Sequence, residues 1–295
     1  MGDTVVPQTE ASLNIASAAV LYGLSVYTVF PVRKLDSGLA AFRIKDHWQR
    51  LVNSARIIGL DVPEGWDLER FEDAARNVVT ANELDEHAFV RASIHAAEEL
   101  PGVRTRGVGT AVSMFVYEPL CILPSGGARL KTSVWRRTPD VSIPSRAKVN
   151  GGYVNSALAR QDALDSGYDD CVFLDTQGHV CELSAANLFI VRDGILHTPD
   201  RASDILEGVS RRTMLELAQE AGVETRERTI DLTELYIADE VFACGTSAYL
   251  TPIIEVDKRR IGKGEPGTIT ETLRERYTKL ISGQLPEYAH YFTEL

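Results

Sequence analysis

The chain has 295 residues, of which 44% are hydrophobic and 25% charged, as in ordinary soluble globular proteins. This length predicts two domains or one large one. The net charge of -11 argues against nucleic acid and anionic membrane surfaces as partners, because both bind basic patches. A small anionic substrate is still compatible with this charge, since a nearby arginine outweighs the global sign at short range.

Four scattered cysteines without a C-x-x-C pair predict free thiols and a reducing, cytoplasmic location. Cys171 and Cys244 lie in apolar, strand-like runs, where a buried thiol is expected. The six histidines show no metal-ligand spacing, so no metal site is predicted. The N-terminal stretch lacks the basic residues of a signal peptide, and no run reaches about 18 apolar residues, so no transmembrane helix is expected.

Residues 1–118 predict a small N-terminal domain of helices and strands. The apolar run 18–30, interrupted by Gly23, predicts a turn or short helix that leads into a strand. Apolar residues spaced by three and four predict helices over 45–59 and from Asp67 to about Ala81, with Asp67 as N-cap. The residues that the second helix is expected to bury are Leu68, Phe71, Ala75 and Val78. Further strands are expected at 41–43, 89–93 and 109–117.

Residues 119–129, which contain Pro-Ser-Gly-Gly at 124–127, predict a linker to a larger domain over 130–295. In this half, Asp193-Gly194 is a strong two-residue hairpin signal, and Gly167 and Gly222 are typical of residues that follow a helix C-terminus. The expected helices are 153–166, 210–221 and 270–282, and the expected strands are 171–175, 179–182, 188–192, 195–197 and 241–244. The predicted fold class is α/β (α+β) in two domains.

Three chemical features are concentrated between residues 148 and 211. Lys148 lies 34 residues before Glu182, and the stretch 206–211 predicts a loop running into a helix N-terminus, which is a ready anion site. A lysine, a remote carboxylate and a phosphate-sized helix N-terminus together suggest pyridoxal 5'-phosphate. The amine would form the Schiff base, the carboxylate would keep the pyridine nitrogen protonated, and the helix end would hold the phosphate.

A long, gapped motif strengthens this interpretation. E-x-S-x-x-N-L-F at 182–189, L-x-T at 196–198 and L-x-G-V-x-R at 206–211 resemble the signature of class IV (fold type IV) aminotransferases. The resemblance extends from about Tyr22 to the C-terminal helix and is strongest with branched-chain amino acid aminotransferases. It implies a fold type IV homodimer with a small N-terminal α/β domain, a larger C-terminal domain with a barrel-like mixed sheet, and the cofactor between them.

The resemblance also implies which residues bind the cofactor. It makes Lys148 the catalytic lysine and Glu182 the partner of the pyridine nitrogen. The further cofactor residues that it implies are Arg50, Val209, Ser210 and Thr246 at the phosphate, Tyr153 at the ring 3' oxygen, and Leu206. Each of these has an ordinary alternative interpretation, such as a solvated lysine, a strand-end glutamate, a polar-face arginine or a core tyrosine.

Substrate residues follow from the same resemblance. The turn that contains Ser247 and Ala248 is similar to one whose amides hold the substrate carboxylate. Arg91 corresponds to an arginine that binds a distal carboxylate, and the aromatic residues expected at the substrate are Tyr22, Tyr27 and Phe89. The ordinary alternatives are a strand-edge arginine and plain core aromatics.

The sequence departs from the family pattern on this substrate side. The family shows Glu, Gly and Arg where this chain has Thr28, Val29 and Pro31, and it shows Tyr where this chain has Phe89. The expected cofactor set is therefore complete, while the substrate set is altered. The predicted function is ping-pong transfer of an amino group from an apolar, branched-chain-like amino acid to a 2-oxo acid such as 2-oxoglutarate.

Several alternatives remain open at this stage. Within the family they are an (R)-selective amine:pyruvate transaminase, a D-amino acid transaminase and an aminodeoxychorismate-lyase-like enzyme. A nucleotide-binding protein is disfavoured, because neither a third glycine nor a helix pattern follows Gly107-Val108-Gly109. A non-catalytic binding module with the same fold is disfavoured because Lys148 and Glu182 are both present.

Overall fold

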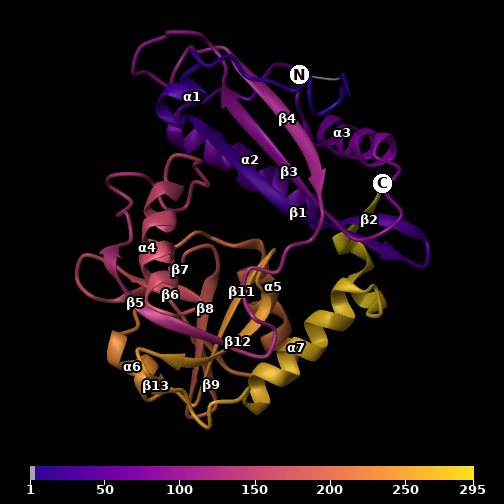
Figure 1. Cartoon of the computed structure of the whole chain (residues 1–295). Helices are drawn as coiled ribbons and strands as arrows, with labels where there is room; N and C mark the ends of the chain where they lie inside the picture. The colour runs from indigo at the N-terminus through magenta and orange to yellow at the C-terminus, as the bar shows by residue number, and fades with distance from the viewer. Residues whose placement is uncertain (1–3) are drawn as a thin grey trace. The chain divides into compact units, whose positions relative to one another are not determined.

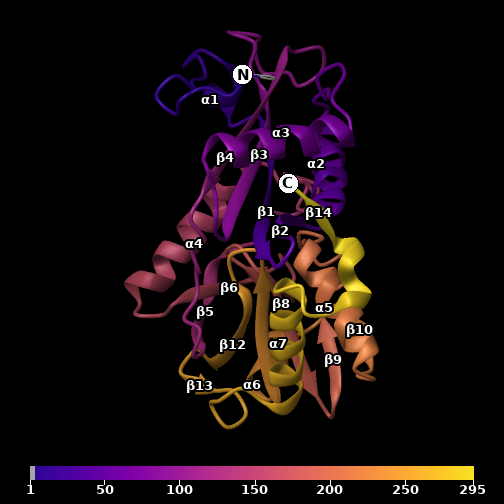
Figure 2. The same cartoon turned by 90° about the vertical axis from the view of Figure 1, so that its right-hand side faces the viewer.

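The computed structural model describes residues 4–295 (Figures 1 and 2). Contacts within the chain divide it into two compact units. The first unit comprises Met1–Pro119, Ala147–Tyr153 and Ile281–Leu295, and the second comprises Leu120–Arg146 and Val154–Leu280. The segment that contains Lys148 therefore clusters with the first unit, although it lies beyond the linker that the sequence predicts.

An antiparallel sheet is the framework of the first unit (Figure 1). Its strand order within the described residues is β14–β2–β1–β3–β4. The bounds are β1 Ser25–Leu35, β2 Gly38–Phe42, β3 Ala88–Ala96, β4 Thr110–Tyr117 and β14 Phe292–Glu294. The short helix α1, Ala18–Tyr22, leads into β1 as predicted, and β2 pairs with β1 as expected for the stretch around Ala41.

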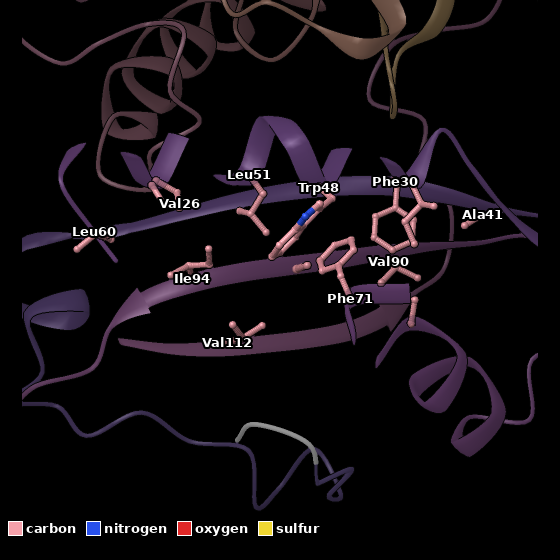
Figure 3. Packing of buried hydrophobic residues seen from close by; sticks show 14 of the residues in the cluster. Val26, Phe30, Ala41, Trp48, Leu51, Leu60, Phe71, Val90, Ile94 and Val112 are labelled. Carbon is pink, nitrogen blue, oxygen red and sulfur yellow. The ribbon is translucent and has the colours of Figure 1, made fainter. Parts of the chain in front are cut away.

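The two faces of this sheet differ, because successive side chains of a strand point to opposite sides. One face packs on helices α2 (Ile44–Ile58) and α3 (Leu68–Ala81), where the Trp48 and Phe71 rings lie 4.8 Å apart (Figure 3). Even-numbered residues of β1 and β3 belong to this core, namely Val26, Phe30, Val32, Val90, Ala92, Ile94 and Ala96. Odd-numbered residues of the same strands, including Tyr27, Phe89 and Arg91, point to the opposite face.

Helix α3 follows its sequence signals with one correction. The Asp67 side chain accepts a hydrogen bond from the Arg70 amide at 2.9 Å, so the predicted N-cap is confirmed. The buried residues of the helix are Phe71, Ala75 and Val79. The prediction that Val78 points inward was wrong by one position, since a spacing of four carries the buried stripe from Ala75 to Val79.

The segment around Lys148 extends the sheet at one edge. Because β2 pairs with residues 32–35 of β1, the same edge of β1 near Val26 is left to another partner. Val26 and Val149 form an antiparallel bridge, and the Tyr27 amide donates to the Lys148 carbonyl at 3.0 Å. Lys148 is thus placed by backbone pairing with β1.

Two glycines permit this close approach. Gly23 has a φ of 68°, and a Cβ on it would lie 2.9 Å from the Cα of Gly151. The Gly151 amide donates to the Gly23 carbonyl at 3.2 Å. A side chain at Gly23 would push the two segments apart, so the sequence around Lys148 needs glycine there.

A mixed sheet forms the second unit. Its strand order within the described residues is β10–β9–β8–β11–β12–β5–β6–β7, and β13 pairs with β12. The pairs β9/β10, β12/β5 and β5/β6 are parallel, and the other pairs are antiparallel. The bounds are β5 Ala128–Arg136, β6 Asp170–Leu174, β7 Val180–Leu183, β8 Asn187–Arg192, β9 Ile195–Thr198, β10 Thr225–Glu227, β11 Glu240–Gly245, β12 Tyr249–Val256 and β13 Arg259–Arg260.

This sheet curls back on itself. Residues 184–186 join β7 directly to β8, yet in the described sheet β11, β12, β5 and β6 lie between them. The end of β7 must therefore return to the start of β8, and the Leu183 amide donates to the Ala186 carbonyl at 2.8 Å in this turn. The curl brings Glu182 and Asn187, on either side of the turn, face to face.

Helices cover the curled sheet. Their bounds are α4 Tyr153–Asp165, α5 Val209–Glu220, α6 Leu232–Tyr236 and α7 Thr268–Ile281, and the 3-10 helix η1, Pro286–Tyr291, precedes β14. Arg276 of α7 forms an ion pair with Glu220 of α5 at 3.2 Å. The predicted hairpin is confirmed, because Asp193 and Gly194 have φ values of 53° and 76° between β8 and β9.

The structure also tests the predictions made for the cysteines, for membrane-spanning helices and for metal sites. Cys171 and Cys244 are buried and unbridged, as predicted, and burial raises the pKa of the Cys244 thiol to about 12. Among residues 4–295, the helices are too short or too polar to span a bilayer. In the same residues, no group of three or more His, Cys, Asp or Glu side chains is arranged to hold a metal ion.

Candidate active site

Lys148 is anchored through its backbone to both β1 and α2. Its carbonyl accepts from the Tyr27 amide, and its own amide donates to the Ser54 hydroxyl oxygen at 3.0 Å. The Ser54 hydroxyl in turn donates to the Arg50 carbonyl on α2 at 2.8 Å. The position of Lys148 is therefore determined by two elements of the first unit and does not depend on its side chain.

The Lys148 amine lies among aromatic groups. Nζ donates to the Tyr153 hydroxyl at 2.5 Å and lies 4.8 Å from the centre of the Tyr27 ring and 5.0 Å from that of Tyr153. The two rings meet edge to face, 5.3 Å apart. Burial raises the pKa of Tyr27, and Tyr153 raises it further through charge repulsion and a hydrogen bond, so Tyr27 remains a neutral phenol.

Arg91 shares this aromatic cluster. Its guanidinium lies 3.7 Å from the centre of the Tyr27 ring and donates to the Asn150 side-chain oxygen at 2.9 Å. Phe89, two residues earlier on β3, is fully buried and packs on Tyr117. Tyr22 differs from these residues, because it lies on α1 and is 42% exposed.

Arg50 lies on the helix-facing side of the same sheet. Its Nη2 donates to the Thr28 hydroxyl oxygen at 3.1 Å, and that oxygen lies 2.8 Å from Nδ1 of His47. His47 precedes Arg50 by almost one helical turn, and the imidazole is buried. Thr28 and His47, neither of which the sequence marked as a site residue, are thus neighbours of Arg50.

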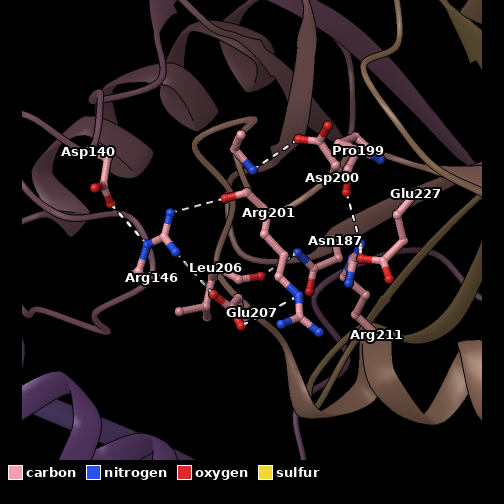
Figure 4. Close-up of polar contacts among 11 residues, drawn as sticks. Asp140, Arg146, Asn187, Pro199, Asp200, Arg201, Leu206, Glu207, Arg211 and Glu227 are labelled. Atoms are coloured by element: carbon pink, nitrogen blue, oxygen red, sulfur yellow. Dashed lines mark hydrogen bonds and ion pairs between the residues drawn. The ribbon is translucent and has the colours of Figure 1, made fainter.

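Glu182, the predicted cofactor acid, lies on β7 of the second unit. Its carboxylate is 2.8 Å from Nη2 of Arg137, and it accepts hydrogen bonds from the Asn187 side chain at 3.0 Å and from the Leu206 amide at 3.1 Å. Asn187 also donates to the Leu206 carbonyl at 2.9 Å, a contact drawn in Figure 4. Arg137, Asn187 and the Leu206 amide are all hydrogen-bond donors, which suits a buried carboxylate.

The N-terminus of α5 lies next to this carboxylate. Gly208 is the N-cap of α5, and a Cβ at this position would lie 2.1 Å from Oδ1 of Asn187. The close approach of the loop to Asn187 therefore requires glycine at 208. Val209 and Ser210 form the first turn, whose amides point out of the helix end. Arg211 fixes the helix by donating to the Pro199 carbonyl and to Glu227 at 2.9 and 2.7 Å (Figure 4).

The remaining predicted residues lie in the turn between β11 and β12. Thr246 and Ser247 are half-buried, and Ala248 is buried. The Ser247 carbonyl accepts from the Ile122 amide at 3.1 Å, and the Ala248 carbonyl accepts from the Thr251 hydroxyl at 2.7 Å. These bonds fix the backbone of the turn.

Two clusters form among the predicted site residues. The first unit brings Tyr27, Arg91, Lys148 and Tyr153 together, with Arg50 on the opposite side of β1. The second unit brings Glu182, Leu206 and the start of α5 together. Of the other predicted residues, the first unit holds Tyr22 and Phe89, and the second holds Thr246, Ser247 and Ala248. Arg137 and Asn187 contact Glu182 and were not among the predicted residues. No local pattern marks Arg137, whereas Asn187 stands in the signature itself.

Each unit carries groups of the kinds that pyridoxal 5'-phosphate needs. Such a cofactor needs a primary amine for its aldehyde, an anion for its pyridinium nitrogen and donors for its phosphate. The first unit has the amine of Lys148 and the guanidinium of Arg50. The second unit has the carboxylate of Glu182 and the glycine-capped start of α5, where a Cβ has no room.

Comparison with known proteins defines the class. The family model for amino-transferase class IV matches residues 25–256. The chain is 35% identical to a branched-chain-amino-acid aminotransferase of Pseudomonas aeruginosa, over 96% of this chain and 92% of that protein. It therefore belongs to the class IV aminotransferase family.

Solved structures agree with this assignment. The branched-chain aminotransferase from Thermoproteus uzoniensis, solved with norvaline, superposes with a TM-score of 0.95 at 34% identity, covering 99% of this chain and 97% of that one. The branched-chain amino acid aminotransferase from Thermobaculum terrenum, solved in its pyridoxal 5'-phosphate form, gives 0.90 at 31% identity, covering 99% and 96%. The protein is thus an aminotransferase with the class IV fold that depends on pyridoxal 5'-phosphate.

Proposed function

We propose that this aminotransferase moves the amino group of an apolar, branched-chain-like amino acid to a 2-oxo acid such as 2-oxoglutarate by a ping-pong mechanism. The names of its relatives support the donor class. The observation that carries the proposal is the Lys148 amine, 2.5 Å from the Tyr153 hydroxyl within a cluster of rings and Arg91. This cluster combines a reactive amine with apolar surface and one cation.

Each residue has a chemical task in this proposal. Bound pyridoxal 5'-phosphate supplies the electron sink for the electron pair of the broken Cα–H bond. Lys148, once its amine is free, moves the α-proton as a general base, and the Tyr153 hydroxyl orients that amine. Glu182 holds the pyridine nitrogen protonated. Arg50, the amides of Val209 and Ser210, and Thr246 bind the phosphate, while Leu206 flanks the ring.

The substrate tasks are divided between charge and apolar surface. The amides of the turn at Ser247 and Ala248 bind the α-carboxylate, and Arg91 binds the distal carboxylate of a dicarboxylic partner. Phe89 and the rings of Tyr27 and Tyr22 favour an apolar side chain by desolvation. The apolar amino acid and the dicarboxylic 2-oxo acid are then bound in turn by the same residues, one in each half of the ping-pong reaction.

The position of Thr28 weakens the case for an (R)-selective amine transaminase. That alternative rested on the departures at Thr28, Val29, Pro31 and Phe89. Thr28 is an even-numbered residue of β1, bonded to Arg50 on the helix-facing side. Its departure from the family pattern therefore concerns Arg50 and not the face that carries Tyr27 and Arg91.

We also propose a homodimer and a cytoplasmic location. Val154 and Leu158, one turn apart on α4, are 64% and 44% exposed, and Val134 on β5 is 70% exposed. Exposed apolar side chains of this size favour burial against a partner surface. Sedimentation equilibrium of the holoenzyme measures the assembly directly.

The proposed cytoplasmic location rests on the cysteines. The four unbridged cysteines suit a reducing compartment.

A panel of amine donors tests the proposed reaction. Purified holoenzyme is mixed with L-leucine, D-alanine or (R)-1-phenylethylamine, and the cofactor absorbance follows each half-reaction. We expect L-leucine to convert the cofactor fastest and 2-oxoglutarate to restore the starting spectrum. Faster conversion by either of the other donors contradicts the proposed substrate, and pyruvate release from aminodeoxychorismate without any half-reaction contradicts transamination itself.

A further inference from the structure

A polar network beside Arg50 contains Thr28, which the family pattern places on the substrate side, and His47, which no sequence pattern marks. Thr28 Oγ1 on β1 accepts from Nη2 of Arg50 at 3.1 Å and lies 2.8 Å from Nδ1 of His47. Thr28 and His47 are buried, whereas Arg50 is half-buried. The network therefore connects the sheet to one side of the guanidinium.

The chemistry of the three groups fixes the direction of one hydrogen bond. A guanidinium only donates, so Thr28 Oγ1 accepts from Arg50. The hydroxyl also pairs with Nδ1 of His47, and the imidazole tautomer decides which of these two groups donates. A charged imidazole would place a second cation 3.5 Å from Nη2 of Arg50.

Packing holds this histidine in place. The His47 ring lies 6.0 Å from the ring of Phe30, which belongs to the same helix-facing side of β1 as Thr28. Phe30 also packs on Phe71 of α3 at 5.8 Å. The imidazole therefore packs against the core of the first unit, next to Thr28.

Because the Thr28 hydroxyl carries no charge, it affects how Arg50 can bind an anion. The class IV pattern has a glutamate at the position of Thr28, where a carboxylate can form an ion pair with the guanidinium. A threonine hydroxyl fixes one donor of Arg50 while leaving the positive charge of the group unchanged. The departure at Thr28 thus alters how an arginine is presented to an anion.

We propose that Thr28 and His47 are positioning residues for the phosphate of pyridoxal 5'-phosphate. The Thr28 hydroxyl orients the guanidinium of Arg50, and Nδ1 of His47 orients that hydroxyl. This inference rests on the phosphate role proposed above for Arg50. Thr28, which the family pattern assigned to the substrate side, would then contribute to cofactor affinity.

The phosphate-free aldehyde provides a selective test. Apoenzyme prepared from the holoenzyme is titrated with pyridoxal 5'-phosphate and with pyridoxal, and binding is followed by absorbance. Replacing Thr28 by valine keeps the shape and removes the hydroxyl. We expect Thr28→Val to bind pyridoxal 5'-phosphate about tenfold more weakly, the loss of one hydrogen bond to a charged group, and pyridoxal as the wild type does. Thr28→Ser should restore the wild-type ratio of the two affinities.

The same strand offers a matched control. The Ser25 hydroxyl lies 3.0 Å from Nδ1 of His95, a second pair of hydroxyl and histidine on β1. We expect Ser25→Ala to leave the ratio unchanged. His47→Phe, which removes Nδ1 and keeps a ring against Phe30, should lower the ratio in the same direction as Thr28→Val and by a smaller factor.

The outcomes separate this inference from the proposed function. An equal loss of both affinities in Thr28→Val, an unchanged ratio, or the same selective loss in Ser25→Ala would overturn the positioning role. Wild-type protein that binds pyridoxal as tightly as pyridoxal 5'-phosphate would overturn the phosphate role of Arg50 itself. Wild-type protein that forms no absorbing adduct with either aldehyde would overturn the proposed function as well.

Discussion

The two groups of site residues are built in opposite ways. In the first unit, the amine of Lys148 and the guanidinium of Arg91 lie against the ring of Tyr27, at 4.8 and 3.7 Å from its centre. In the second unit, the carboxylate of Glu182 is held by discrete hydrogen-bond donors, among them Arg137 at 2.8 Å. Ring contacts contribute about 0.5–2 kcal/mol and weaken gradually, whereas a buried ion pair that loses one partner costs about 3–5 kcal/mol.

This contrast teaches where each cluster is vulnerable. The supports of Lys148 should tolerate conservative changes, because the backbone of the residue is fixed by β1 and Ser54. The supports of Glu182 should not, because removal of any one of its partners leaves a buried charge with fewer donors. The expected effects below follow from that difference, beginning with the reactive group itself.

Replacement of Lys148 by alanine should have the largest effect. The variant keeps the backbone contacts of the segment and loses the amine, so we expect the half-reaction with L-leucine to slow by more than about a thousandfold. Stopped-flow absorbance measures this rate. Lys45→Ala, which changes an exposed lysine on α2, is the control and should react as the wild type does. A loss below tenfold for Lys148→Ala would contradict the catalytic assignment.

Glu182→Gln should come second. The neutral amide no longer balances Arg137 or holds a proton on the pyridine nitrogen, so we expect a turnover about a hundredfold lower and a free energy of unfolding about 3 kcal/mol smaller. Urea unfolding and half-reaction rates separate the two effects. The double variant Glu182→Gln/Arg137→Gln should recover stability but not activity. If activity returns as well, the role of Glu182 is structural.

A Cβ at Gly208 should give a moderate effect. Gly208→Ala forces the loop away from Asn187, and with it the first turn of α5, because the new atom would lie 2.1 Å from Oδ1. We expect about 1–3 kcal/mol lower stability and several-fold weaker binding of pyridoxal 5'-phosphate, measured by thermal unfolding and titration. Gly126→Ala, at a position where a Cβ meets open space, is the control. Equal behaviour of the two variants would remove the steric argument.

The smallest expected effects concern the pH dependence of stability, which should differ between the two units. Burial lowers the pKa of His95 in the first unit to about 4 from 6.5. Between pH 6.5 and about 4, His95 is protonated in the unfolded chain and neutral in the folded chain. The free energy of unfolding therefore decreases as the pH falls through this window. Unfolding midpoints of His95→Asn should therefore depend less on pH in this window than those of the wild type.

The second unit should respond at lower pH. The hydrogen bond with Arg228 lowers the pKa of Glu234 to about 2 from 4.5. Its stabilising effect is complete above pH 4.5 and is lost as the pH falls towards 2. Glu234→Gln should be less stable at neutral pH and should flatten only this lower window. A change in the window of His95 instead would show that the two titrations are misassigned.

Local signals predicted much of the fold. The cap at Asp67, the hairpin at Asp193-Gly194 and the helix-ending Gly167 and Gly222 each depend on a few adjacent residues, and the structure places turns or helix ends there. β14 was missed because its identity depends on pairing with β2, about 250 residues earlier, which no local pattern encodes. The same reason applies to the segment at Lys148, whose pairing with β1 is equally non-local.

The site residues remain a prediction, and the gapped signature at 182–211 supplied part of them. It singled out Glu182 and the start of α5 from sequence alone. Arg137 lies beside Glu182, and His47 beside Thr28, only through the fold, so their sequence neighbourhoods carry no signal. The predicted boundaries at 118 and 130 remain a prediction, and the contact clusters add residues 147–153 and 281–295 to the first unit.

Reduction of the holoenzyme tests the central assignment most directly. Borohydride fixes the bond between a lysine and pyridoxal 5'-phosphate, and mass mapping of the digested protein then locates the added pyridoxyl phosphate. We predict that the label lies on the peptide that contains Lys148. A label on a different lysine, or a reduced protein that carries none, would contradict the account of the active site.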